Sequence, residues 1–123
     1  MRPMTFNRGA KRSFDELPTA IQVAFIASLR VVAAGEVPIH AKALKGFGSA
    51  DVLELRENDR AGTYRVVYTV RFEEAVYVLH AFQKKSKTGI KTDQQTIELI
   101  RQRLKWAEDG HNAWVSRRQE GKR

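Results

Sequence analysis

Four lysines follow an apolar segment of the chain without an intervening acid. They lie in the stretch LHAFQKKSKTGIK, residues 79–91, and are Lys84, Lys85, Lys87 and Lys91. Fixed cations gathered at the end of a strand could bind the phosphate groups of a nucleic acid. The alternative is a solvated loop whose charge only keeps the protein soluble. The rest of the sequence is needed to choose between these two interpretations.

His80 opens the same stretch and is the first candidate for proton transfer. An imidazole titrates near neutral pH, so His80 beside a phosphate site could act as a general acid or base. The alternative is a structural histidine, because His80 shares its strand phase with Val76, Val78 and Phe82. The sequence leaves both interpretations open.

Charged residues also alternate with apolar ones in an earlier segment. In LELR, residues 53–56, Glu54 and Arg56 are out of phase with the leucines, so they share a polar face. Arg65 lies between Tyr64 and Val66 and should join that face. Glu54 could serve as a general base, or it could form an ion pair with Arg56 or Arg65. A polar surface that carries these arginines and the lysines would suit a phosphodiester.

Two longer segments have helical periodicity and must flank whatever sheet carries these residues. Residues 15–34 place apolar side chains three and four positions apart, which predicts a helix. Residues 92–110 do the same, and Thr92 with Gln95 has the form of a capping box. A short helix or turn is expected at residues 40–44.

Alternating periodicity predicts the strands. Residues 52–57, 63–70 and 75–82 are expected to form three antiparallel strands joined by short turns. Residues 4–7 could add a short edge strand or could be loose. Residues 111–123 are expected to form a flexible basic tail. The predicted fold class is therefore α+β, a small antiparallel sheet with helices packed on one face and a basic, concave open face.

Composition limits the function classes. The 123 residues are expected to form one domain with its core at about residues 14–109, and the formal charge of +8 favours polyanionic partners. The absence of cysteine excludes disulfides and thiol catalysis. His40 and His111 lack partners at metal-ligand spacing, so no metal site is expected. No segment has the length and apolarity of a membrane span or a signal peptide, and we expect a cytoplasmic protein.

Several of these segments together resemble a known family. LELREND (53–59), GTYRVVYTV (62–70) and VYVLHAFQKKSKTGIKT (76–92), followed by the helix with IRQRLK (100–105), are similar to the phage-derived, HigB-like branch of the RelE/ParE toxin superfamily. The resemblance covers residues 14–108. It implies the same α+β fold and a metal-independent endoribonuclease, without a cofactor, that cuts messenger RNA on the ribosome through attack by the 2′-hydroxyl of the RNA.

The resemblance also implies roles for single residues. Arg65 falls where such toxins place a phosphate-binding arginine, and Lys85 falls where they place a second one. Lys84 is adjacent, and a like charge beside it would lower the pKa of either lysine. Arg56 matches a further arginine of the family, and Lys87 and Lys91 would add RNA-binding charge.

Two departures separate the chain from RelE itself. Where RelE has two lysines on the strand of LELR, this sequence has Val52 and Glu54. Thr88 and Gly89 stand where RelE carries a tyrosine. The division of labour in RelE therefore cannot be transferred whole, and His80 and Glu54 are the residues that could fill the gap.

The implied partners are messenger RNA, the ribosome and a cognate antitoxin, a small helix-turn-helix DNA-binding protein. Two alternatives remain open at this point. A ParE-like protein of the same fold would bind and inhibit DNA gyrase without a catalytic cluster. A non-catalytic module would use the basic face only to hold RNA or the ribosome.

Overall fold

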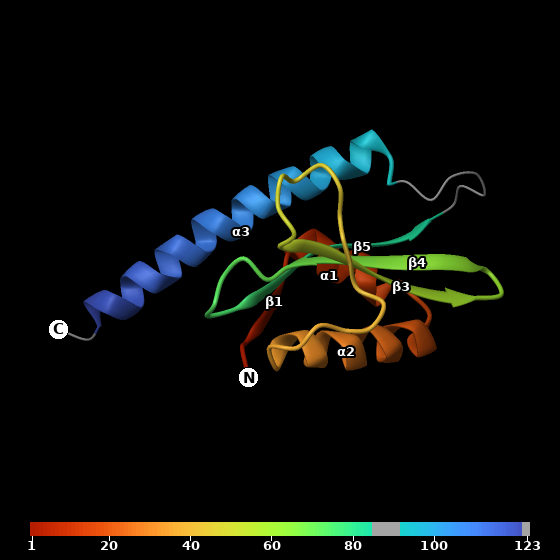
Figure 1. Cartoon of the computed structure of the whole chain (residues 1–123), viewed down its shortest axis with the longest axis horizontal. Helices are drawn as coiled ribbons and strands as arrows, with labels where there is room; N and C mark the ends of the chain where they lie inside the picture. Colours follow the sequence, from red (N-terminus) through yellow and green to blue (C-terminus); the bar gives the residue numbers. More distant parts are fainter. Residues whose placement is uncertain (85–91, 122–123) are drawn as a thin grey trace.

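The computed structural model describes residues 1–84 and 92–121. Five strands and three helices follow one another in the order β1 (Met4–Phe6), α1 (Arg8–Asp15), α2 (Thr19–Ala33), β2 (Lys42–Ala43), β3 (Val52–Asp59), β4 (Gly62–Thr69), β5 (Val76–Lys84) and α3 (Gln94–Glu120) (Figure 1). No helix in the described ranges is long and apolar enough to cross a membrane.

The strands form one sheet in the order β1-β5-β4-β3-β2. β2 to β5 pair antiparallel, and β1 lies parallel to β5 at the edge. The predicted α+β class and the central meander are confirmed. The edge strand near residues 4–7 is present, whereas residues 42–43 form a short strand in place of the expected helix or turn.

The first helical segment is divided into two helices. Asn7 caps α1, because its side-chain oxygen accepts hydrogen bonds from the backbone N–H groups of Gly9 and Ala10. Pro18 occupies the N-cap position of α2. The predicted single helix over residues 15–34 therefore corresponds to α2 alone, and α1 was not foreseen.

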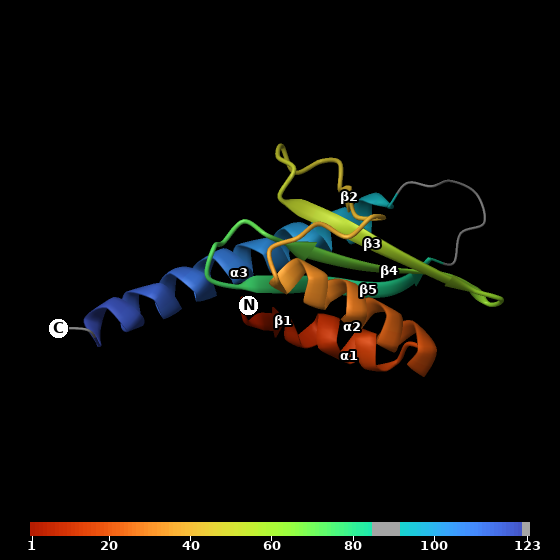
Figure 2. The same cartoon turned by 60° about the horizontal axis from the view of Figure 1, so that its bottom comes forward.

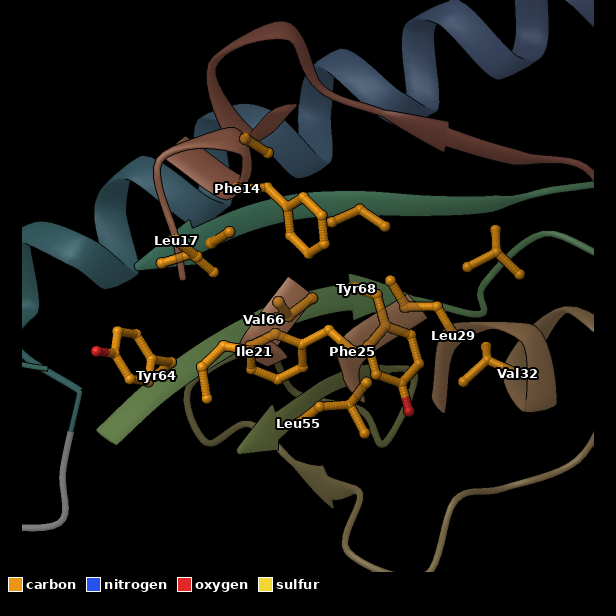
Figure 3. Packing of buried hydrophobic residues seen from close by; sticks show 14 residues of the cluster. Phe14, Leu17, Ile21, Phe25, Leu29, Val32, Leu55, Tyr64, Val66 and Tyr68 are labelled. Atoms are coloured by element: carbon orange, nitrogen blue, oxygen red, sulfur yellow. The ribbon is translucent and has the colours of Figure 1, made fainter. Parts of the chain in front are cut away.

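Helices α1 and α2 pack on one face of the sheet, and α3 packs on the other (Figure 2). The first face buries Phe14, Phe25 and Leu29 of these helices against β-strand residues such as Val66 and Tyr68 (Figure 3). This face holds the larger group of buried apolar side chains, so most of the hydrophobic stabilisation arises there.

The second face was predicted to be open, and the structure corrects that expectation. Its apolar residues pack against one stripe of α3 and are Val52, Val67, Tyr77, Leu79, Ile100, Leu104 and Ala107. The same strands carry Glu54 and Arg65 on this face, so the face is apolar at one part and charged at another. The physical reason for the correction is that apolar surface is buried wherever a matching helix stripe exists.

A β-bulge in β5 changes the phase of its side chains. Val67 pairs with His80, but Tyr68 pairs with Val78, so Leu79 is an extra residue in β5. Leu79 packs under α3, whereas Val78 packs under α1 and α2. The sequence had predicted that His80 shares a face with Val78. The bulge places the two side chains on opposite faces, so that prediction is wrong.

The last helix starts and ends later than expected. Asp93 is the N-cap, and its carboxylate accepts a hydrogen bond of 2.8 Å from the backbone N–H of Thr96. α3 then continues through Gly110 to Glu120 and extends past the sheet (Figure 1). Its later half is held by His111, which is buried and stacks on Phe72. Residues 111–120 are thus helical, where the sequence predicted a loose tail.

Candidate nucleic-acid interface

The predicted site residues of three strands meet at one end of the second face. Arg56 of β3 lies directly across from Arg65 of β4. Lys84 ends β5, and Arg65 and Arg56 both act electrostatically on it. Glu54 and Thr92 complete a group that we call the cationic cluster: Glu54, Arg56, Arg65, Lys84 and Thr92. Lys85, Lys87 and Lys91 lie outside the described residues.

Glu54 bridges the two arginines of the cluster. Its Oε1 accepts a hydrogen bond of 2.8 Å from Arg56 Nε, and its Oε2 accepts one of 3.2 Å from Arg65 Nη1. Two like charges directly opposite each other in a sheet repel, and the carboxylate between them offsets that cost. The alternative of an ion pair, which the sequence left open for Glu54, is therefore realised in this structure.

Arg65 is buried, although it was expected to be exposed. Arg65 is 2% exposed to solvent, and Glu54 is 3% exposed. The Thr92 hydroxyl, which precedes α3, accepts from Arg65 Nη1 at 3.2 Å and donates to Glu54 Oε2 at 3.3 Å. The prediction of a common polar face for these residues is confirmed, but that of an exposed Arg65 is wrong, because Glu54 and the entry to α3 cover the guanidinium.

Arg56 and Lys84 are the more accessible cations of the cluster. The side chain of Arg56 is 33% exposed, and Lys84 is half-buried. Burial, followed by the positive charges of Arg65 and Arg56, lowers the pKa of Lys84 below its usual value. A lysine with a lowered pKa gives up its proton more readily, so Lys84 could donate to a leaving oxygen.

His80 lies beside the cluster but is engaged by α3. Its ring stacks on Phe82 with centroids 4.8 Å apart, and its Nδ1 lies 2.9 Å from Arg103 Nη1. A guanidinium can only donate, so Nδ1 is the acceptor and the neutral ring carries its proton on Nε2. Burial, and then the charge of Arg103, lowers the pKa of His80 to about 4. This geometry favours the structural interpretation, and a catalytic role for His80 stays a prediction.

Sequence reasoning missed Thr92 and Arg103 as members of this region. Thr92 was assigned to a capping box, but the adjacent Asp93 caps the helix and leaves the threonine hydroxyl for Glu54 and Arg65. Arg103 also donates to the carbonyl of the bulged Leu79 at 3.1 Å. A signal for Arg103 was present, because it lies three residues after Ile100 and four before Ala107, within the apolar stripe of the helix.

Metal ligands are not grouped anywhere in the part of the chain that the structure describes. No set of three His, Cys, Asp or Glu side chains there could hold an ion. The charged side chains that the structure brings together at this site are those of Glu54, Arg56, Arg65 and Lys84. Such a set suits an anion with several oxygens, such as a phosphodiester.

The fold and this site define an α+β protein with a charged end to its sheet, and comparison with known proteins identifies the family. Residues 12–105 match the family model described as phage-derived protein Gp49-like, so the chain belongs to that family. The resemblance to a phage-derived family, predicted from the sequence, is confirmed. A search of the curated proteins found no match.

Solved structures of toxins share the fold. Isolated Escherichia coli RelE matches with a TM-score of 0.54 at 17% identity, covering 83% of this chain and 98% of RelE. A double mutant of E. coli RelE in the free state matches with a TM-score of 0.52 at 21% identity, covering 70% and 86%. The intact E. coli RelBE toxin–antitoxin complex matches with a TM-score of 0.50 at 19% identity, covering 70% and 100%. The RelE-like fold predicted from the sequence is thus confirmed.

Proposed function

We propose that this chain is the toxin of a toxin–antitoxin system and that it cleaves RNA at the cationic cluster. The observation that carries the proposal is the placement of Arg56, Arg65 and Lys84 around the carboxylate of Glu54, which leaves an excess of positive charge even with the nearby Asp93 included. The RelE-like fold supports it, because the sequence resemblance to such toxins assigned a phosphate-binding role to Arg65.

The proposed reaction needs no external nucleophile. The 2′-hydroxyl of one nucleotide attacks the adjacent phosphorus, the bond from phosphorus to the 5′ oxygen breaks, and the products are a 2′,3′-cyclic phosphate and a 5′-hydroxyl. Negative charge builds up on the phosphate oxygens during the attack. Arg56, Arg65 and Lys84 would stabilise that charge as preorganised donors, which is commonly the largest contribution to such a rate.

Glu54 has two successive tasks in this proposal. Without RNA it holds Arg56 and Arg65 in place by accepting a hydrogen bond from each guanidinium. A phosphate that enters the cluster competes for the same guanidinium groups, so it would free the carboxylate to take the proton of the 2′-hydroxyl. Lys84 or Lys85 would then protonate the leaving 5′ oxygen. His80 has no part in this scheme, because its Nδ1 is bound to Arg103.

The proposed substrate is messenger RNA on the ribosome, and the proposed regulator is an antitoxin encoded beside the toxin. A solved structure of the same fold is a toxin–antitoxin complex, which supports the proposal of an antitoxin as regulator. The formal charge of +8 would speed encounter with an acidic antitoxin and with RNA, so both associations should slow as salt is added. Action on ribosome-bound RNA places the protein in the cytoplasm.

Expression of the chain alone in bacteria tests the proposal. We expect growth arrest and messenger RNAs with new 5′-hydroxyl ends, mapped by ligation that is selective for such ends. The double variant Lys84→Ala/Lys85→Ala should lose both effects, whereas Lys45→Ala, an exposed lysine that is not part of the cluster, should keep them. Arrest with damaged DNA and intact messenger RNA would show a gyrase inhibitor instead. Arrest with both nucleic acids intact would show a binding module.

A further inference from the structure

The outer edge of β1 has an open set of backbone hydrogen-bonding groups. The N–H of Val76 donates to the carbonyl of Pro3 at 2.9 Å, and the N–H of Asn7 donates to the carbonyl of Val78 at 2.9 Å. In a parallel ladder this spacing directs the peptide groups of residues 3, 5 and 7 toward β5. The N–H and C=O groups of Met4 and Phe6 therefore point away from the sheet, and no hydrogen bond joins them to any described residue.

A groove runs beside this open edge. It is shallow and open to solvent, and residues of β1 and α1 line it. Figure 2 shows β1 and α1 next to each other along the lower edge of the molecule. Met4 and Phe6 are half-buried against the core at its floor, which gives an incoming chain some apolar surface.

The wall of the groove is basic. Arg8, Lys11 and Arg12 of α1 line it and are exposed. Asp15 is the acid of the lining, and it is already paired with Lys11 at 2.5 Å. The groove therefore carries two more cations than anions, and the side chains of an occupant should be acidic.

The pattern of donors and acceptors selects a protein chain over a nucleic acid. Along β1 the open groups repeat every second residue, about 6.6 Å apart, which is the spacing of another strand. A nucleic acid could neutralise the cations but could not satisfy this ladder. Exposed strand edges are used in this way by proteins that bind extended peptides.

We propose that β1 and the basic wall of α1 bind an extended acidic segment of a partner protein, which adds to the sheet as a sixth strand. The segment places backbone groups against Met4 and Phe6 and carboxylates against Arg8 and Arg12. This surface involves none of the residues of the cationic cluster, so the proposal stands independently of RNA cleavage.

Binding of a defined peptide to the full chain tests the proposal. The probe is a blocked synthetic peptide of eight residues in which Glu alternates with Val, followed by fluorescence anisotropy and by amide chemical shifts. We expect shifts at the Met4 and Phe6 amides, and an affinity that falls by at least about tenfold for the double variant Arg8→Glu/Arg12→Glu. The matched change Arg30→Glu, on the exposed side of α2, should leave the affinity unchanged.

A proline variant separates strand addition from charge attraction alone. Met4→Pro removes one outward N–H but none of the hydrogen bonds to β5, so it should weaken peptide binding by about tenfold with the sheet intact. The melting temperature and the amide shifts of β5 report whether the sheet is intact. If the sheet is intact and Met4→Pro binds like the wild type, strand addition is ruled out. The same holds if the peptide with Lys in place of Glu binds equally well.

Discussion

The two ends of the sheet face beneath α3 carry opposite balances of charge. The cationic cluster at one end has three cations, Arg56, Arg65 and Lys84, around the carboxylate of Glu54, and the Asp93 carboxylate also acts on Lys84. The other end, which we call the acidic cluster, has three carboxylates, Asp51, Glu74 and Glu108, near the guanidinium of Arg71, and Arg118 acts electrostatically on Glu74.

The two buried or partly buried histidines on this face differ in the charge of their neighbours in the same way. His80 lies against the guanidinium of Arg103, whereas the Nε2 of His111 lies 3.1 Å from a Glu74 carboxylate oxygen. His111 also contacts the Tyr77 hydroxyl at 2.9 Å. At the acidic cluster, Arg71 and Glu74 of the β4–β5 turn pair with Asp51 before β3 and with residues of α3, which is typical of a structural role. At the cationic cluster positive charge remains in excess, which is typical of a site that binds an anion.

The largest effect is expected from Arg65→Ala. The variant leaves the buried Glu54 carboxylate without one of its donors, so the free energy of unfolding should fall by about 3 kcal/mol, measured by urea denaturation. RNA cleavage should be lost at the same time. Adding Glu54→Gln removes the stranded charge and should restore part of the stability but none of the cleavage. Wild-type stability of Arg65→Ala would contradict the buried ion pair.

A smaller effect is expected from the pH dependence of stability at His80. Its pKa is lowered from 6.5 to about 4 in the folded protein. Between these values the unfolded chain binds a proton that the folded chain does not, so stability is full above pH 6.5 and falls as the pH drops toward 4. The loss should reach about 2 kcal/mol, allowing for the partial exposure of the ring.

The variant His80→Gln checks this assignment. Its stability relative to the wild type should improve as the pH falls from 7 to 4.5, because glutamine does not titrate. A constant difference between the two proteins over that range would refute the shifted pKa. The same variant tests catalysis, since a folded and fully active His80→Gln protein would end the candidacy of His80 as an acid or base.

Removal of Lys84 should separate activity from stability. Lys84→Ala should lower the rate of RNA cleavage by about tenfold, because one stabilising charge is lost from the transition state. The free energy of unfolding should stay the same, since the lysine is half-buried and its loss relieves repulsion from Arg65 and Arg56. Lys45→Ala is the matched control. An equal loss of rate in both variants would show that only total charge matters.

The smallest effect is expected at the acidic cluster. Arg71 makes hydrogen bonds of 2.9 and 3.1 Å to Asp51 and also donates to Glu108 of α3. Because these side chains are partly exposed, Arg71→Met should lower the free energy of unfolding by only about 1 kcal/mol and leave RNA cleavage unchanged. Arg60→Met, in the exposed β3–β4 turn, controls for the lost charge. A loss of cleavage in Arg71→Met alone would break the distinction between the two clusters.

The sequence predicted the strands and the meeting of Arg56 with Arg65, because alternation depends only on local pattern. It could not predict that Arg65 is buried, since burial depends on Glu54 and Thr92 arriving from elsewhere in the chain. The bulge at Leu79 could not be predicted for a related reason, because one extra residue in a strand is not visible in the sequence pattern. Gly110 suggested a helix end, but His111 beyond it is buried, and that tertiary contact outweighs the low helix propensity of glycine.

The pairing of β1 with β5 also sets the order in which the chain can assemble. Met4 emerges first during synthesis, yet its neighbour Val76 follows only after more than half of the chain has been made. The meander of β3, β4 and β5 needs only short loop closures and can form early, whereas the parallel pairing of β1 requires a long one. We therefore expect β1 to dock last in refolding, as the slowest group of amides to gain protection from hydrogen exchange.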